Sequence, residues 1–241
     1  MPRFLAICLL VCPLLAPAAR GMNTLRQGDD ANLGIGINQV GVLVYPPGML
    51  YNGIHSGEVR IAISVDETGR LTDFLITGYT EKGFVDGVVA AVKRWSYSPA
   101  LTSGRAQSAR AEVLFVFKDQ GVIVQRLPGA AEREFLSGML DGYYSYLPCR
   151  LRDLDHIPIP AQELVSPAAR LGNEAHDVTV EFYIDEEGRV RMAAVPREAA
   201  DDIYSAAAVA AVEQWRFEPP LRKGKPVLVL VEQQFKFRPK K

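Results

Sequence analysis

The chain has little cysteine, with three residues in 241. Cys8 and Cys12 both lie in the first twenty residues, so removal of that segment would leave Cys149 alone. A framework of intramolecular disulfides is then excluded. No neighbour of Cys149 in the sequence supplies the positioned histidine that a cysteine nucleophile needs, so we interpret Cys149 as a small, partly buried residue.

Histidine is also scarce. His55, His156 and His176 lack the spacing of a metal site and any suitably placed cysteine or acidic cluster. The glycine-containing segments 34–36 and 223–225 lack the further glycine or the following helix of a phosphate-binding loop. We therefore expect no metal, no cofactor and no enzymatic activity. With 27 basic and 28 acidic residues and no basic stripe, the chain is not expected to bind nucleic acid either.

Long apolar segments are missing too, apart from residues 4–16. This run has 13 residues, whereas a membrane-spanning helix needs about 20. Arg3 precedes the run and small residues follow it, which is the layout of a secretory signal peptide. We predict a signal peptide over residues 1–18, cleaved after Ala18, and a mature protein that is periplasmic or secreted. An uncleaved anchor in the inner membrane, facing the periplasm, is the alternative.

The sequence does contain an internal repeat, which is the first feature to decide its domain organisation. The repeat has two blocks, with an offset of 119 residues in the first and 120 in the second. The shared positions include Gly69 and Gly188, Trp95 and Trp215, and Pro99 and Pro219. We interpret these residues as structural anchors: glycine for a turn, tryptophan for a core, and proline for the end of a helix.

Each copy shows the same order of predicted elements. Apolar and polar residues alternate from Val59 to Val65, which predicts a strand with one buried face. An Asp-x-x-Gly turn and a second apolar segment predict a hairpin. Apolar residues at three- and four-residue spacing, ending at Trp95, then predict an amphipathic helix. The predicted elements are 59–65, 71–76, 85–95 and 111–118 in the first copy, and 178–184, 190–195, 204–215 and 227–237 in the second.

These elements predict an α+β fold with two tandem β-β-α-β domains, each a three-stranded antiparallel sheet with one helix packed on a face. The predicted boundaries are 1–18 for the signal peptide, 19–44 for an N-terminal segment, 45–119 for copy 1, 120–164 for a connector and 165–241 for copy 2. A stripe of apolar residues from Phe135 to Tyr144 predicts a packed helix in the connector. A ligand groove lined by Tyr143, Tyr144 and Tyr146 is the alternative.

The order of these motifs resembles the C-terminal domain of TonB. Each copy carries Asp-x-x-Gly-Arg after its first strand, Trp-x-[Tyr/Phe]-x-Pro after its helix, and Phe-x-Phe at the end of its last strand. Copy 1 also has Tyr45-Pro46-Pro47 upstream of its first strand, as that family does. The resemblance covers about residues 45–119 and 165–239. Each motif alone is weak, but their order, spacing and double occurrence are specific.

The resemblance implies a protein-binding role. TonB couples the proton gradient of the inner membrane to outer-membrane receptors, and its C-terminal domain binds a receptor segment by adding it as a strand to a sheet edge. In this chain the last strand of each copy is the expected edge, and self-association through the same edges is a second expectation. The candidate residues are Ala111, Val113, Phe115 and Phe117 in copy 1, and Val229, Val231, Gln233 and Phe235 in copy 2.

The chain departs from a TonB energy transducer at its N-terminal side. A transducer has a long proline-rich spacer, whereas residues 20–44 are not proline-rich. Even in a fully extended polyproline conformation, this segment would reach only about 80 Å. The preferred prediction is an exported periplasmic protein-binding module that serves TonB-dependent outer-membrane transport. The alternatives are an inner-membrane-anchored energy transducer and a structural protein of the cell envelope.

Overall fold

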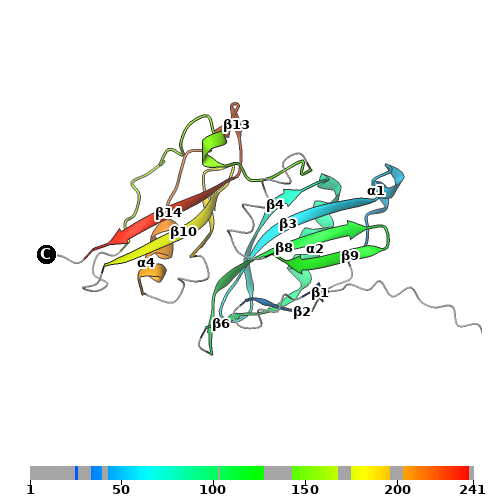
Figure 1. Cartoon of the computed structure of the whole chain (residues 1–241), viewed down its shortest axis with the longest axis horizontal. Coiled ribbons are helices and arrows are strands. Elements are labelled where there is room, and N and C mark those ends of the chain that lie inside the picture. The colour runs from blue at the N-terminus through cyan, green and yellow to red at the C-terminus, as the bar shows by residue number, and fades with distance from the viewer. Residues whose placement is uncertain are drawn as a thin grey trace, which may run out of the picture.

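The computed structural model describes residues 25–26, 34–39, 43–102, 104–127, 143–167, 175–195 and 203–238. Copy 1 and copy 2 each form a sheet with a helix, and Figure 1 shows them side by side, copy 2 on the left and copy 1 on the right. The predicted signal peptide and most of the predicted connector helix lie outside the described residues, so both stay predictions.

The structure of copy 1 is built mainly from strands. Copy 1 and the segments that flank it contain the strands β1 (Leu25–Arg26), β2 (Gly36–Gln39), β3 (Ser56–Val65), β4 (Leu71–Tyr79), β5 (Ser96–Ser98), β6 (Ala100–Thr102), β7 (Arg105–Gln107), β8 (Ala109–Lys118) and β9 (Gly121–Arg126). Its helices are α1 (Pro47–Tyr51), the 3-10 turn η1 (Lys82–Phe84) and α2 (Val85–Arg94). Asp86 in the first turn of α2 and Lys93 in its last turn complement the helix dipole.

The sheet of copy 1 has five strands in the order β1-β9-β8-β3-β4. The prediction of a three-stranded sheet is therefore wrong for this copy. After β8 the chain reverses at Gly121, and β9 pairs antiparallel with β8 because Val122 and Val124 reach buried positions there, at 1% and 2% exposure. β1 then pairs with β9 in parallel, with Leu25 opposite Val124.

Copy 2 contains a smaller sheet of three strands in the order β11-β10-β14. Its elements are the 3-10 turn η2 (Leu151–Asp153), β10 (His176–Ile184), β11 (Val190–Ala194), α4 (Ile203–Val212), β12 (Leu221–Arg222), β13 (Lys225–Pro226) and β14 (Val229–Phe237). β10 and β14 pair without a register shift, from Ile184 opposite Val229 to His176 opposite Phe237. Mostly antiparallel sheets with few helices are compatible with the predicted α+β class.

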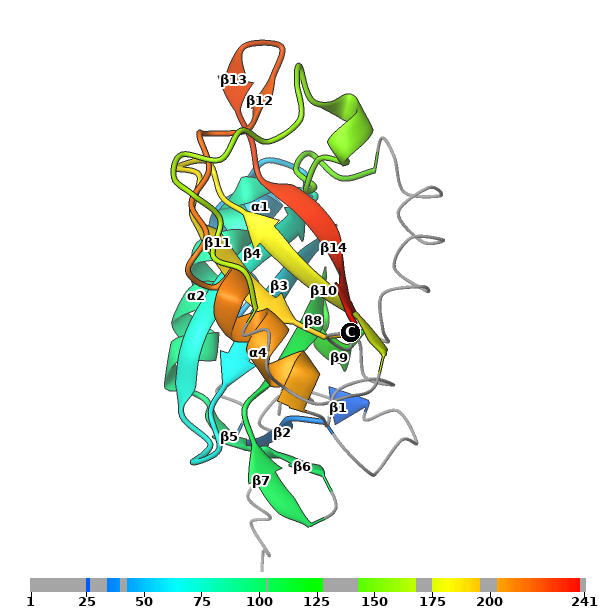
Figure 2. The ribbon, with the colours of Figure 1, turned by 90° about the vertical axis from the view of Figure 1, so that its left-hand side faces the viewer.

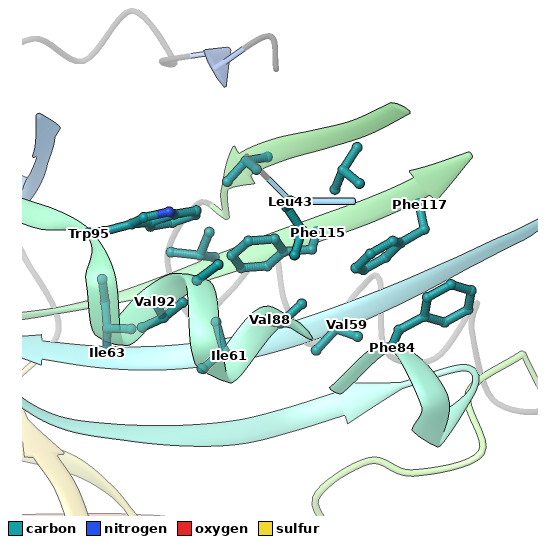
Figure 3. Packing of buried hydrophobic residues seen from close by; sticks show 14 of the residues in the cluster. Leu43, Val59, Ile61, Ile63, Phe84, Val88, Val92, Trp95, Phe115 and Phe117 are labelled. Carbon is teal, nitrogen blue, oxygen red and sulfur yellow. The ribbon is translucent and has the colours of Figure 1, made fainter. Parts of the chain in front are cut away.

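A single hydrophobic core lies between α2 and the sheet of copy 1. Figure 3 shows Val88 and Val92 of α2 facing Phe115 of β8 and the alternate apolar residues of β3. The rings of Trp95 and Phe115 stack at a centroid distance of 5.3 Å. Since side chains alternate between the two faces of a strand, the remaining residues of β3 point away from α2.

These outward faces of the two sheets pack against each other. Ala62 of β3 forms a buried cluster with Tyr183, Met192 and Leu228 of copy 2. Figure 2, turned so that copy 2 faces the viewer, shows β10 and β14 lying in front of the sheet of copy 1. Each sheet therefore has its own helix on one face and the other copy on the opposite face.

Two arginines add polar contacts across this boundary. Arg191 of β11 donates to both carboxylate oxygens of Asp73 in β4, at 2.9 and 2.5 Å. Arg110 of β8 lies 3.8 Å from the carboxylate of Glu181, with both side chains at most 7% exposed, and it stacks over the ring of Tyr183. Loss of one partner from a buried charged pair is strongly destabilising, so the Arg110–Glu181 contact favours one arrangement of the two copies.

Candidate protein-interaction edge

The repeated tryptophans connect each helix to the last strand of its copy. Trp95 and Trp215 are 5% and 6% exposed. Trp215 lies 5.7 Å from the ring of Phe235, as Trp95 lies close to Phe115 in copy 1. These contacts account for the tryptophans through packing, with no need for a ligand. The prolines Pro99 and Pro219 follow the tryptophans, ahead of β6 and β12.

Gly69 and Gly188 sit in the hairpin turns, with φ of +85° and +77°. Glycine adopts this left-handed region without a steric penalty. A Cβ atom at Gly188 would also collide with the backbone carbonyl of Phe217. Glycine is therefore favoured in each turn for two reasons: the positive φ, and the close approach of a neighbouring backbone segment.

The aspartate of each turn bonds backbone groups rather than an external ligand. Asp66 Oδ1 accepts hydrogen bonds from the backbone N–H groups of Thr68 and Arg70, both at 2.9 Å. The hydroxyl of Thr68, which donates to the same oxygen, contributes most to a lowered pKa of Asp66, followed by the Arg70 N–H. Asp185 forms the corresponding bonds in copy 2, at 3.1 and 2.8 Å. The two equivalent aspartates, Asp66 and Asp185, thus stabilise the hairpin turns.

The predicted edge in copy 1 is not an edge. β8 lies between β3 and β9, so its backbone is paired on both sides at Val113, Phe115 and Phe117, whereas Ala111 pairs with β3 alone. The sequence contained a signal for β9, since Asp119-Gln120-Gly121 is a turn and Val122 and Val124 alternate after it. The predicted boundaries place the residues from Gln120 onward in the connector instead. The expectation that a partner strand adds to β8 is corrected by this pairing.

Among the described residues, the predicted edge in copy 2 is unpaired on its outer side over most of its length. The connector pairs with only the start of β14, where Cys149 N–H donates to Leu228 O and Leu230 N–H donates to Cys149 O. Among the described residues, no other strand pairs with the outer side of β14. The outer side from Val231 to Phe237 is therefore available to a further strand.

The bonds to Cys149 also show which backbone groups face this open side. Polar groups of alternate residues point to opposite sides of a strand in an antiparallel pair. Because Leu228 and Leu230 point outward, the N–H and C=O groups of Glu232, Gln234 and Lys236 point outward too. The odd-numbered candidates Val229, Val231, Gln233 and Phe235 bond toward β10 and present their side chains on the face of α4.

The tyrosines of the connector fasten it to the two copies. Tyr144 is buried, accepts a hydrogen bond from Arg60 Nε at 3.0 Å and donates to Glu58. Tyr146 stacks on Tyr79 and donates to Glu186 at 3.0 Å. Burial contributes most to the raised pKa values of both tyrosines. Because these hydroxyls are engaged by protein groups, the alternative of a tyrosine-lined ligand groove is not supported.

Three observations concern metal binding, the remaining cysteine and membrane spans in the part of the chain that the structure describes. No group of three or more histidine, cysteine or acidic side chains is placed to hold a metal ion there. The thiol of Cys149 is buried and unpaired with another cysteine, 3.8 Å from Arg222 Nη1. No described helix has both the length and the apolar character needed to cross a membrane.

The described residues form two tandem copies of a sheet with a helix, and β14 is an edge strand of the second sheet. The family model described as Gram-negative bacterial TonB protein C-terminal matches the chain twice, over residues 42–118 and 166–239. These matches cover more than half of the chain, which therefore belongs to the TonB C-terminal family. Members are protein-interaction domains of TonB-like proteins, and the family is not an enzyme family. A comparison with curated proteins gives no match.

Proposed function

We propose that the chain is an exported, periplasmic protein-binding module that accepts a partner segment as an added strand on β14. The observation that carries this proposal is that no described strand pairs with the outer side of β14 from Val231 to Phe237. An added strand gains affinity from backbone hydrogen bonds, and the outward groups of Glu232, Gln234 and Lys236 are spaced for it. Outer-membrane receptor segments are the proposed partners, which would place the chain in TonB-dependent transport.

The contacts around β14 hold this edge strand in place. β10 covers the inner side of β14 along its whole length, and α4 lies on one face of the sheet. Copy 1 packs against part of the other face, where Leu228 and Leu230 lie in the cluster that the two copies share. A partner strand would therefore extend an existing sheet without rearrangement of either copy.

A proline placed at an outward N–H tests the site directly. Gln234→Pro removes one donor from the open side and leaves the odd-numbered bonds to β10 in place, which is the position where an edge strand tolerates proline. Gln234→Thr keeps the N–H and serves as the matched control. In pull-downs with synthetic segments of outer-membrane receptors, we expect wild type and Gln234→Thr to retain a segment and Gln234→Pro to lose it.

Equal retention by all three proteins would remove β14 as the site, and retention by none would remove the proposed partner class. Thermal melts of the free proteins check that Gln234→Pro remains folded. The export part of the proposal rests on the apolar segment 4–16 and is tested separately, by intact mass of the protein purified from the native envelope. A mass lacking residues 1–18 supports a free periplasmic protein, and a full-length mass in the inner-membrane fraction supports the anchored transducer.

A further inference from the structure

The strand β9 occupies, in copy 1, the position that is open beside β14 in copy 2. Phe115 in β8 is the repeat equivalent of Phe235 in β14, and the two pair with equivalent residues, Val59 and Val178. β9 pairs with the side of β8 that faces away from β3. The corresponding side of β14 is the open one, so the two copies are the same site in a filled and an unfilled form.

The phenylalanines of the last strand are more deeply buried in copy 1, where β9 lies beside that strand, than in copy 2. Phe115 and Phe117 are both fully buried in copy 1. Their equivalents Phe235 and Phe237 are only partly buried, although Trp215 and Tyr204 contact them from the side of α4. Tyr45 also covers Phe117, at a centroid distance of 6.2 Å, but the strand opposite both phenylalanines in copy 1 is β9.

The side chains of β9 show what fills the space. Val122 lies opposite Phe117 and Val124 lies opposite Phe115. Directly opposed residues of antiparallel strands share a face, with Cβ atoms about 5 Å apart. Both valines belong to the core of copy 1, whereas Ile123 between them is on the other face. The occupant of this site is thus an antiparallel strand with branched apolar residues at two alternate positions.

We propose that β9 is a built-in occupant of the strand-addition site of copy 1, so that the chain takes up one external strand, at copy 2. We further infer the chemistry of that strand: it runs antiparallel to β14 and places two branched apolar side chains over Phe235 and Phe237. This inference rests on the proposed function, because it specifies the ligand of the same edge. It makes the repeated domain a monovalent binder in which copy 1 serves as the support of copy 2.

The full chain and a labelled peptide of residues 120–127, Gln-Gly-Val-Ile-Val-Gln-Arg-Leu, test the inference by fluorescence anisotropy and calorimetry. We expect one peptide per chain and loss of binding in Gln234→Pro but not in Gln234→Thr. A peptide with both valines replaced by serine should bind at least about ten-fold more weakly, because it would bury much less apolar surface over Phe235 and Phe237.

Each other result overturns part of the inference. Two peptides per chain would show that β9 leaves the site of copy 1, and equal binding of the serine peptide would refute the apolar pattern. If receptor segments bind in a manner sensitive to Gln234→Pro while the β9 peptide does not bind, the inference fails and the proposed function stands. If receptor segments fail while the β9 peptide binds at the edge, the strand pattern stands and the receptor assignment fails.

Discussion

Truncation of the equivalent phenylalanines, Phe115→Ala and Phe235→Ala, is expected to have unequal effects on stability. Phe115 is fully buried, stacked on Trp95 and covered by Val124 of β9. Its truncation removes a complete aromatic side chain and leaves an enclosed cavity, so the free energy of unfolding should fall by about 3–5 kcal/mol. Copy 1 would then lose most of the stability of an ordinary small domain.

Phe235 occupies the same place in copy 2 but is only partly buried. Its truncation removes less apolar surface from water, and solvent can enter the vacated space from the open edge, so no enclosed cavity remains. We expect a loss of about 1–2 kcal/mol, at the lower end of the value for complete burial of a phenylalanine. The difference between the two variants should therefore be at least about 1 kcal/mol.

Urea unfolding followed by tryptophan fluorescence measures both variants, since each copy contains its own tryptophan beside the substituted ring. Equal losses in the two variants would refute the reasoning, because they would show that β9 contributes nothing to the burial of Phe115. A second measurement uses a saturating partner strand. The penalty of Phe235→Ala should then rise toward that of Phe115→Ala, because the partner would cover Phe235 as β9 covers Phe115.

Three further predictions concern the turns and the boundary between the copies. Asp66→Asn keeps a hydrogen-bond acceptor in the turn but removes the negative charge. Because the pKa of Asp66 is lowered in the folded protein, the Asp66 carboxylate should stabilise the fold above about pH 4, and this stabilisation should be lost as the pH falls through the folded pKa. In a double-mutant cycle, Arg191→Ala and Asp73→Ala should show a coupling of about 1 kcal/mol, reduced by salt because both side chains are partly exposed. Gly188→Ala should lower the free energy of unfolding by more than Gly224→Ala. Both glycines have a positive φ, which costs about 1–2 kcal/mol for a residue with a side chain, but of the two only Gly188 also faces a backbone carbonyl. The pH dependence of stability tests the Asp66 prediction, and thermal melts test the other two. A stability difference that does not change with pH would contradict the first prediction, zero coupling the second, and equal effects of the two glycine substitutions the third.

Several features could be read from the sequence because they depend on local pattern. The alternation of Val59 to Val65 and the Asp-x-x-Gly turn specify a hairpin whatever surrounds it, and β3 and β4 form there. The helical spacing that ends at Trp95 specifies α2 in the same way. The repeat was visible because a shared tryptophan, proline and glycine at constant separation rarely coincide without a common fold.

The sequence by itself thus determined the α+β class, the two copies and the family, since these follow from periodicity, turn chemistry and ordered motifs. Only the tertiary structure decided which edge is open. The two last strands carry the same Phe-x-Phe motif, and although copy 2 has Gln233-Gln234 where copy 1 has Val113-Leu114, this difference does not show which strand has a neighbour on its outer side. The difference comes from β9: its alternating valines indicate a strand, but its place beside β8 is fixed by long-range packing into the core of copy 1. The contact between the copies was hidden for the same reason: Arg110, Met192 and Leu228 are far apart in the chain, and their meeting depends on the packing of two completed sheets.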